Sequence, residues 1–227
     1  MKRKSLMCLV ACLSLLLTGS GMTVAQEARS ANPAPGTVTF NFDADIPGQA
    51  PAGFTSYASG GGPAGKWVVQ ERSDAPSRKM VVEQTDADST DSRFPLLIAD
   101  QGEYADVDVS VKGKAISGKV DRAIGLVFRF RDPQSYYVCR ANALEDNLNL
   151  YKMVNGRRKQ IAGTKVKVSS DQWHALRVVA KGDHIVCYFD GQKLIEVQDA
   201  TYTKGKVGLW TKADSVTAFD DLTVAKP

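Results

Sequence analysis

The chain has 227 residues and a formal net charge of +4 at neutral pH. Lys2, Arg3 and Lys4 supply three of these charges, and no acidic residue lies among residues 1–25, so the remainder has a net charge of +1. A nearly neutral chain lacks the basic surplus that is typical of nucleic-acid-binding proteins. We therefore expect no nucleic-acid partner.

The first 25 residues have the pattern of a secretory signal peptide. Basic residues at positions 2–4 precede an apolar run, Leu6–Leu17, and the small residues Thr23-Val24-Ala25. The run is too short for a membrane-spanning helix, and no later segment is long enough, so we expect no membrane span after signal removal. A secreted or periplasmic location follows. The alternative is lipidation at Cys12, because Leu9-Val10-Ala11-Cys12 is similar to a bacterial lipobox.

Residues 26–36 (QEARSANPAPG) predict a flexible leader, and residues 37–227 predict one domain rich in short strands. Glycine, proline and serine crowd residues 47–65, which predicts a long surface loop. No apolar period of 3.6 residues persists for three turns, so we expect an all-β, two-sheet antiparallel sandwich. The strands expected outside the central part of the chain are 37–42, 66–70, 79–84, 95–100, 105–111, 206–210 and 218–224.

Residues 123–191 predict five consecutive strands, separated by turn signals such as Asp132-Pro133 and Gly182-Asp183. Apolar and polar residues alternate along each strand, as in a sheet that is buried on one face. The alternation predicts a set of core residues between the two sheets. This set is Phe40, Phe128, Phe130, Leu150, Leu176, Phe189 and Phe219.

Two cysteines, Cys139 and Cys187, remain after signal removal. In a simple meander they lie three strands apart, roughly 14 Å at about 4.8 Å per strand. A disulfide needs Cα atoms within about 7 Å, so we expect two unpaired, buried thiols.

Six short motifs follow one another along the chain. They are F-N-F-D (40–43), Y-Y-V-C-R-A-N (136–142), Q-W-H-A-L-R-V (172–178), Y-F-D-G (188–191), G-K-V-G-L-W (205–210) and F-D-D-L-T-V (219–224). In combination they resemble the concanavalin A-like lectin/glucanase superfamily, and within it bacterial secreted jelly rolls of the laminin G-like and 3-keto-disaccharide hydrolase-like type. The resemblance implies a jelly roll whose first and last strands pair and whose concave sheet face binds sugar.

The outward face of the predicted five-strand sheet collects polar and aromatic residues. Guanidinium groups donate hydrogen bonds to sugar hydroxyls and carboxylates, and tyrosine rings stack on sugar rings. The alternative is an ordinary solvated sheet face. The candidate ligand-binding residues are Arg129, Arg131, Arg140, Asn142, Asn149, Tyr151, Arg177 and Tyr188.

The resemblance also implies a structural calcium ion near the paired termini, for which Asp43 and Asp221 are the candidate ligands. The acidic run Asp86–Asp91 lacks the glycine of an EF-hand loop and predicts an ordinary loop. His174 and His184 lie near no recognisable nucleophile and are interpreted as structural or surface residues. The basic run Arg157–Lys159 predicts a solvated turn.

Three functions are compatible with these features. The first is an exported carbohydrate-binding sandwich, the second a 3-keto-disaccharide hydrolase-like enzyme, and the third a laminin G-like adhesion or protein-interaction module. No E-x-D-x-x-E run of the laminarinase-like glycosidases occurs, and no carboxylate pair can be assembled from spacing. Binding is therefore favoured over catalysis, and the catalytic residues are unknown.

The nature of the saccharide can be predicted from charge. Four arginines on one sheet face, with no acid in the outward positions of those strands, repel one another unless something compensates them. An anionic ligand would do so. We therefore expect an acidic saccharide as the partner.

Overall fold

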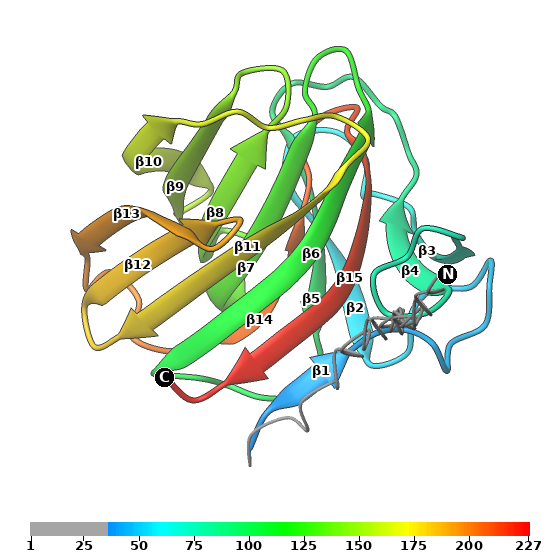
Figure 1. The fold of residues 1–227 in the computed structure, drawn as a ribbon. Coiled ribbons are helices and arrows are strands. Elements are labelled where there is room, and N and C mark those ends of the chain that lie inside the picture. The colour runs from blue at the N-terminus through cyan, green and yellow to red at the C-terminus, as the bar shows by residue number, and fades with distance from the viewer. Residues whose placement is uncertain (1–35) are drawn as a thin grey trace, which may run out of the picture. The chain divides into compact units, whose positions relative to one another are not determined.

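The computed structural model describes residues 36–227; the predicted signal peptide and almost all of the predicted leader lie outside this range. The described residues belong to one compact unit. Its fold is all-β, with two antiparallel sheets packed face to face as a jelly-roll sandwich (Figure 1). The predicted fold class is confirmed.

The first sheet, sheet A, has the hydrogen-bonded order β13-β12-β11-β6-β15-β4-β3, with β1 also paired to β15. Its strands are β1 (Val38–Phe40), β3 (Trp67–Glu71), β4 (Met80–Gln84), β6 (Val107–Ser117), β11 (Trp173–Lys181), β12 (His184–Phe189), β13 (Gln192–Gln198) and β15 (Val216–Ala225). Val38 pairs with Val224 and Phe40 with Leu222, so the first strand joins the last strand of the domain, as expected.

The second sheet, sheet B, has the order β10-β9-β8-β7-β14-β5-β2. Its strands are β2 (Phe54–Gly60), β5 (Arg93–Ala99), β7 (Ala123–Asp132), β8 (Ser135–Asn142), β9 (Asn147–Val154), β10 (Arg157–Lys165) and β14 (Lys206–Trp210). Three strands, β2, β10 and β13, were not predicted, and β2 occupies part of the expected 47–65 loop.

The predicted five-strand meander is wrong, because its strands divide between the two sheets. Strands β7, β8 and β9 lie in sheet B, whereas β11 and β12 lie in sheet A. The unpredicted strand β10 completes the meander of sheet B, and residues 166–172 then carry the chain across to sheet A (Figure 1).

Apolar side chains form a main cluster between the sheets and a second cluster on the other face of sheet B. The main cluster contains Phe128, Leu150, Leu176, Phe189 and Phe219, as predicted, with Phe40 packed at its edge. The second cluster contains Phe94, Leu96, Ile98, Ala123, Val127, Phe130, Tyr136, Val138, Tyr151, Met153 and Trp210. Both faces of sheet B are therefore largely buried.

Phe130 belongs to the second cluster, so its predicted place between the sheets is wrong. The reason is a bulge in β7, where register shifts between Phe128 and Asp132 and Arg129 has a φ of 50°. A bulge adds a residue to one strand and reverses the side-chain alternation beyond it. Leu126 and Phe128 face sheet A, whereas Phe130 faces the opposite side.

Cys139 and Cys187 are both unpaired and buried, as predicted. The strand-count argument was nevertheless wrong, because β8 and β12 belong to different sheets. The two thiols meet in the main cluster between these sheets, and the proximity of Cys139, together with burial, raises the pKa of the Cys187 thiol.

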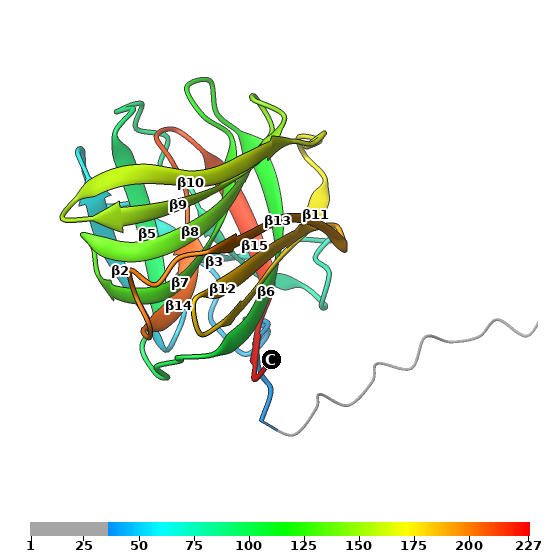
Figure 2. The same ribbon diagram turned by 90° about the vertical axis from the view of Figure 1, so that its left-hand side faces the viewer.

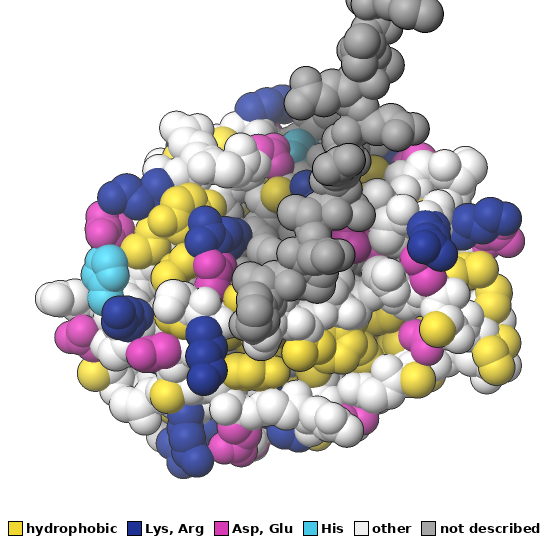
Figure 3. Space-filling model, turned by 60° about the horizontal axis from the view of Figure 1, so that its bottom comes forward, with side chains coloured by type: hydrophobic (Ala, Val, Ile, Leu, Met, Phe, Trp, Pro, Cys, Tyr) yellow, Lys and Arg dark blue, Asp and Glu magenta, His cyan; other side chains and the backbone are white. Residues whose placement is uncertain are grey.

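In residues 36–227 no helix is both long and apolar enough to cross a membrane. Figure 3 shows one face of the molecule, on which basic and acidic side chains are interspersed.

Candidate functional site

Sheet B is strongly curled, and the face turned away from sheet A is its concave face. Arg158 on β10 places its guanidinium carbon 4.7 Å from the ring centre of Phe94 on β5. Four strands separate β10 from β5 in the sheet order, which is roughly 24 Å across a flat sheet. Sheet B curls between β10 and β5 (Figure 2), and this curvature brings the two side chains together.

The hydrogen-bonding register aligns one row of residues across this concave face. Trp210 on β14 pairs with Gly125 on β7, Gly125 with Arg140 on β8, and Arg140 with Asn149 on β9. Gly125 is required here, because a Cβ at this position would lie 2.8 Å from the Trp210 ring. The glycine thus lets the indole lie flat over β7, beside the polar residues of the row.

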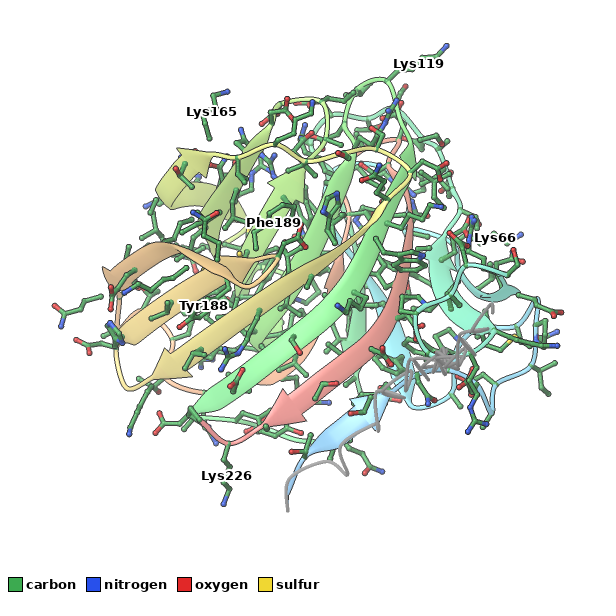
Figure 4. All side chains as sticks on the ribbon, in the orientation of Figure 1. Lys66, Lys119, Lys165, Tyr188, Phe189 and Lys226 are labelled. Carbon is green, nitrogen blue, oxygen red and sulfur yellow. The ribbon has the colours of Figure 1, made fainter. Side chains whose placement is uncertain are left out.

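A hollow of about 460 Å³ opens beside this row. It is lined by Arg140, Glu145, Asn147, Asn149, Tyr151, Arg158, Gln160, Gly163, Thr164 and Lys165. Lys165 projects outward at the end of β10 (Figure 4). A hollow of this size bordered by amide, hydroxyl and charged groups suits a small polar ligand.

Tyr151 links the polar residues of the hollow. Its hydroxyl oxygen accepts hydrogen bonds from Arg140 Nη2 at 2.8 Å and from Asn149 Nδ2 at 2.8 Å. A phenol has one proton to donate, and the Tyr151 hydroxyl uses it in no bond among the described residues. The hydroxyl can therefore donate to a ligand oxygen.

Arg140 is 2% exposed and holds the wall of the hollow in place. Besides Tyr151 it donates to Glu145 Oε2 at 3.1 and 3.2 Å and to Asn147 Oδ1 at 2.9 Å. Burial alone would raise the pKa of Glu145, but hydrogen bonds from Asn147 and Arg140 lower it below its ordinary value. Glu145 is therefore ionised and pairs with Arg140. Arg140 Nε remains buried without a partner among the described residues.

A buried carboxylate, Asp121, lies behind this wall. It accepts a hydrogen bond from Asn142 Nδ2 at 2.8 Å and lies 3.0 Å from Lys212 Nζ. Burial raises the pKa of Asp121, against the lowering effect of Arg140 and Lys212. Lys212 also pairs with Asp91, and both acids raise its pKa although burial opposes this. Lys212 is thus paired with two carboxylates at this end of the concave face.

The loop that carries Asp121 is held by another carboxylate. Asp214 accepts hydrogen bonds from three consecutive backbone N–H groups, those of Lys119, Val120 and Asp121, at 2.6, 3.0 and 3.0 Å. These charge-assisted bonds fix the loop and thereby the buried carboxylate.

Arg93 joins the loops at the same end of sheet B, a role that sequence reasoning missed. It is 1% exposed and donates to the carbonyls of Pro63 and Ala213 at 2.8 Å each and to Asp86 Oδ2 at 2.6 Å. The predicted acidic loop therefore contributes two ion pairs, Asp86 with Arg93 and Asp91 with Lys212. Only burial distinguishes Arg93 from the surface arginines, and the sequence does not show it.

The eight predicted ligand-binding residues do not share one face. Arg140, Asn149 and Tyr151 line the hollow, and Asn142 is buried behind it. Arg129 is 1% exposed and donates to the backbone carbonyls of Ala105, Tyr202 and Gly182. The bulge at Arg129 turns its side chain inward, so its predicted place on the outward face is wrong.

The remaining three predicted residues lie away from the hollow. Arg131 is exposed near Tyr202, 5.9 Å from that ring. Arg177 and Tyr188 lie on the outer face of sheet A, where the guanidinium stacks on the ring at 5.0 Å and binds Asp108 at 2.5 and 2.7 Å. Figure 4 labels Tyr188 beside Phe189 on β12. Their predicted place with Arg140 is wrong because β11 and β12 belong to sheet A.

The predicted calcium ligands are Asp43 and Asp221. Burial raises the pKa of Asp221, and the negative charge of Asp43 nearby raises it further. In the part of the chain that the structure describes, no group of three or more His, Cys, Asp or Glu residues could hold a metal ion. Calcium binding stays a prediction. His174 is buried between Asp190 and the Ser169 carbonyl, and His184 is half exposed beside Glu196.

The architecture is that of the concanavalin A-like jelly rolls, with a polar hollow on the concave sheet. The family described as 3-keto-alpha-glucoside-1,2-lyase-like domain matches residues 40–225, and the chain belongs to this family. The chain is also similar to the levanase of Bacillus subtilis (strain 168), 27% identical over 119 residues. This match covers 51% of the chain and 16% of the levanase.

Solved structures share the fold. The carbohydrate-binding module CBM66 from Bacillus subtilis superposes with a TM-score of 0.61 at 20% identity, over 77% of this chain and 96% of the module. Domain 4 of AbnA, an extracellular arabinanase from Geobacillus stearothermophilus in complex with arabinotriose, gives a TM-score of 0.51 at 12% identity, over 75% and 82%. A protein with a galectin-like fold from Bacillus subtilis gives 0.52 at 14%, over 75% and 89%.

Proposed function

We propose that this protein is an exported carbohydrate-binding domain that holds a saccharide on the concave face of sheet B. The observation that carries the proposal is the hollow on this face, in which Arg140, Asn149 and Tyr151 converge. Its lining groups are amides, hydroxyls and charged side chains, which can exchange hydrogen bonds with the hydroxyls of a sugar. The family match and the levanase and CBM66 similarities support a sugar as the ligand.

Export rests on the sequence alone, through the signal peptide proposed for residues 1–25. Its test is the N-terminus of the protein recovered from outside the cytoplasm, which we expect near Gln26. Recovery of an intact Met1 would contradict export by cleavage.

The partners of three arginines bear on the kind of saccharide. Arg140 is paired with Glu145, Arg177 with Asp108, and Arg129 with backbone carbonyls. The premise of the acidic-saccharide prediction, four uncompensated arginines on one face, is therefore absent. The similarities to a levanase and to an arabinanase domain in complex with arabinotriose support a neutral saccharide instead, and the first ligands to test are levan oligosaccharides and arabinotriose.

The test is calorimetric titration of the purified protein with these two neutral ligands and with a uronate-bearing oligosaccharide. We expect heat with at least one neutral ligand and weaker binding by Tyr151→Phe, which lacks the free hydroxyl donor. Tyr188→Phe, on the outer face of sheet A, is the matched control and should bind as the wild type does. Equal binding by both variants, or no binding by the wild type, would refute the proposal. Preference for the uronate ligand would restore the acidic alternative.

A second candidate function is lyase activity on 3-keto-glycosides, which the family description favours. Asp121 is the candidate for proton transfer, because burial raises its pKa although Lys212, 3.0 Å away, lowers it. Incubation with a 3-keto-disaccharide and detection of released monosaccharide tests this, with Asp121→Asn as the inactive control. Release at equal rates by both proteins would exclude Asp121.

The third function, a laminin G-like adhesion or protein-interaction module, remains open. Within residues 36–227 the large exposed apolar side chains are Val38, Ile46, Val120 and Leu144. They lie on separate segments of the chain, so they offer little support for a protein-docking surface.

A further inference from the structure

We propose that Arg158 is a specificity-determining residue of the concave face and binds an acceptor oxygen of the saccharide directly. This inference rests on the proposed saccharide site and names a residue that the sequence assigned to a solvated turn. The turn is a two-residue hairpin loop, Asn155-Gly156, in which both residues have positive φ, 51° and 73°. Such Asn-Gly turns fix the register of the flanking strands.

The register decides which way Arg158 faces. Arg157 pairs with Val154, and Arg158 pairs with Met153, a member of the cluster on the concave face. Because neighbouring strand residues point to opposite faces, Arg158 lies on the concave side and Arg157 on the other. Arg157 is exposed, whereas Arg158 is half-buried and lines the hollow.

Aromatic rings hold the Arg158 guanidinium in place. Its central carbon lies 4.7 Å from the ring centres of both Phe94 and Tyr151 and 6.0 Å from that of Trp210. Each such contact attracts the cation to the ring faces. A planar group stacked on rings keeps its N–H bonds directed sideways from the stack, where a ligand in the hollow can reach them.

Arg158 also lacks a protein acceptor. The described residues provide it with no hydrogen bond and no ion pair, and its Nη1 is buried without a partner. Two buried arginines do have protein acceptors: Arg140 donates to Glu145 and Asn147, and Arg129 donates to backbone carbonyls. The nearby carboxylate of Asp91 is engaged by Lys212. A buried donor without a partner is costly, and a ligand oxygen removes this cost.

The inference predicts a specific effect of side-chain identity. Lysine keeps the positive charge of arginine but lacks its planar set of donors. Arg158→Lys should therefore bind the saccharide more weakly than the wild type does. Because a hydrogen bond to a charged group contributes about 1.5–3 kcal/mol, Arg158→Ala should weaken binding about ten-fold or more. Arg157→Ala, on the opposite face of the same strand, should leave affinity unchanged.

Calorimetric titration with levan oligosaccharides or arabinotriose, whichever the wild type binds, tests the inference, together with the melting temperature of each variant. Guanidinium ion at tens of millimolar should partly restore binding to Arg158→Ala, and sodium ion at the same ionic strength should not. A purely structural role would lower the melting temperature without such rescue, which would overturn the inference.

The two levels of the proposal fail in different ways. If Tyr151→Phe loses affinity while Arg158→Ala binds as well as the wild type or better, the saccharide site stands and the role of Arg158 is refuted. If the wild type binds no saccharide, the proposed function fails and the inference fails with it.

Discussion

Replacement of Arg140 by alanine tests whether the wall of the hollow is a buried, ordered network. The substitution removes the donor of four hydrogen bonds, which reach Glu145, Asn147 and Tyr151. It also removes a positive charge that lowers the pKa of the buried Asp121. Loss of one partner of a buried pair costs about 3–5 kcal/mol. Glu145 is about half exposed, so we expect the lower end, about 3 kcal/mol.

The matched control is Arg177→Ala on the outer face of sheet A. Arg177 also makes a two-bond ion pair, with Asp108, but its side chain is 46% exposed. Exposed pairs contribute about 0–1 kcal/mol.

Urea unfolding and thermal melting of both variants give the measurement. For a domain of this size, 3 kcal/mol corresponds to a fall in melting temperature of roughly 6–12 °C, against a few degrees at most for the control. Equal losses in the two variants would show that the Arg140 network is no more than a surface contact.

Three further predictions concern the core and the pH dependence of stability. Phe128→Ala should cost about 3–5 kcal/mol in urea unfolding, because the ring is fully buried and stacked on Tyr137; a loss below about 1 kcal/mol would contradict its burial. Cys139 and Cys187 should resist alkylation in the native protein and both react after denaturation under non-reducing conditions; a disulfide-linked peptide pair would contradict this. Burial raises the pKa of Asp220 from an ordinary value of 3.8 to about 6, so the folded state keeps this proton to higher pH than the unfolded chain does, and stability falls as pH rises through this interval. Asp220→Asn should remove that fall from the unfolding curves between pH 4 and about 6, and an unchanged difference from the wild type across this range would refute it.

The sequence predicted the fold class because alternation and turn residues are local signals. Leu126 and Phe128 point into the main core as their alternation predicts. Beyond Arg129 the alternation predicted the wrong face for Phe130. A bulge at Arg129, which has a positive φ, reverses the side-chain alternation and places Phe130 on the concave side. A bulge leaves no reliable mark in a single sequence.

The sequence brought some of the hollow-lining residues together for a related reason. Arg140, Asn149 and Tyr151 lie on adjacent strands joined by a short turn, so local register brings them together. Arg177 and Tyr188 were misplaced because the choice of sheet depends on the path of residues 166–172, which alternation does not encode.

The sequence could not predict the contact between Arg158 and Phe94, because this contact depends on the curvature of sheet B. Arg158 and Phe94 are 64 positions apart and four intervening strands separate their own strands, yet they are in contact. From the sequence alone, a basic residue after Asn155-Gly156 is expected to lie in a solvated turn. The curvature of the sheet is what places it against the rings of the concave face. Hairpin register was the one available signal, because it places Arg158 opposite Met153.

The most direct test of saccharide binding on the concave face is an NMR titration of the isotope-labelled protein with levan oligosaccharides and arabinotriose. Binding in the hollow predicts saturable shifts of the signals of Arg140, Asn149, Tyr151 and the Trp210 indole, with Arg177 and Tyr188 unchanged. Shifts confined to Arg177 and Tyr188, or no shifts with either ligand, would contradict it.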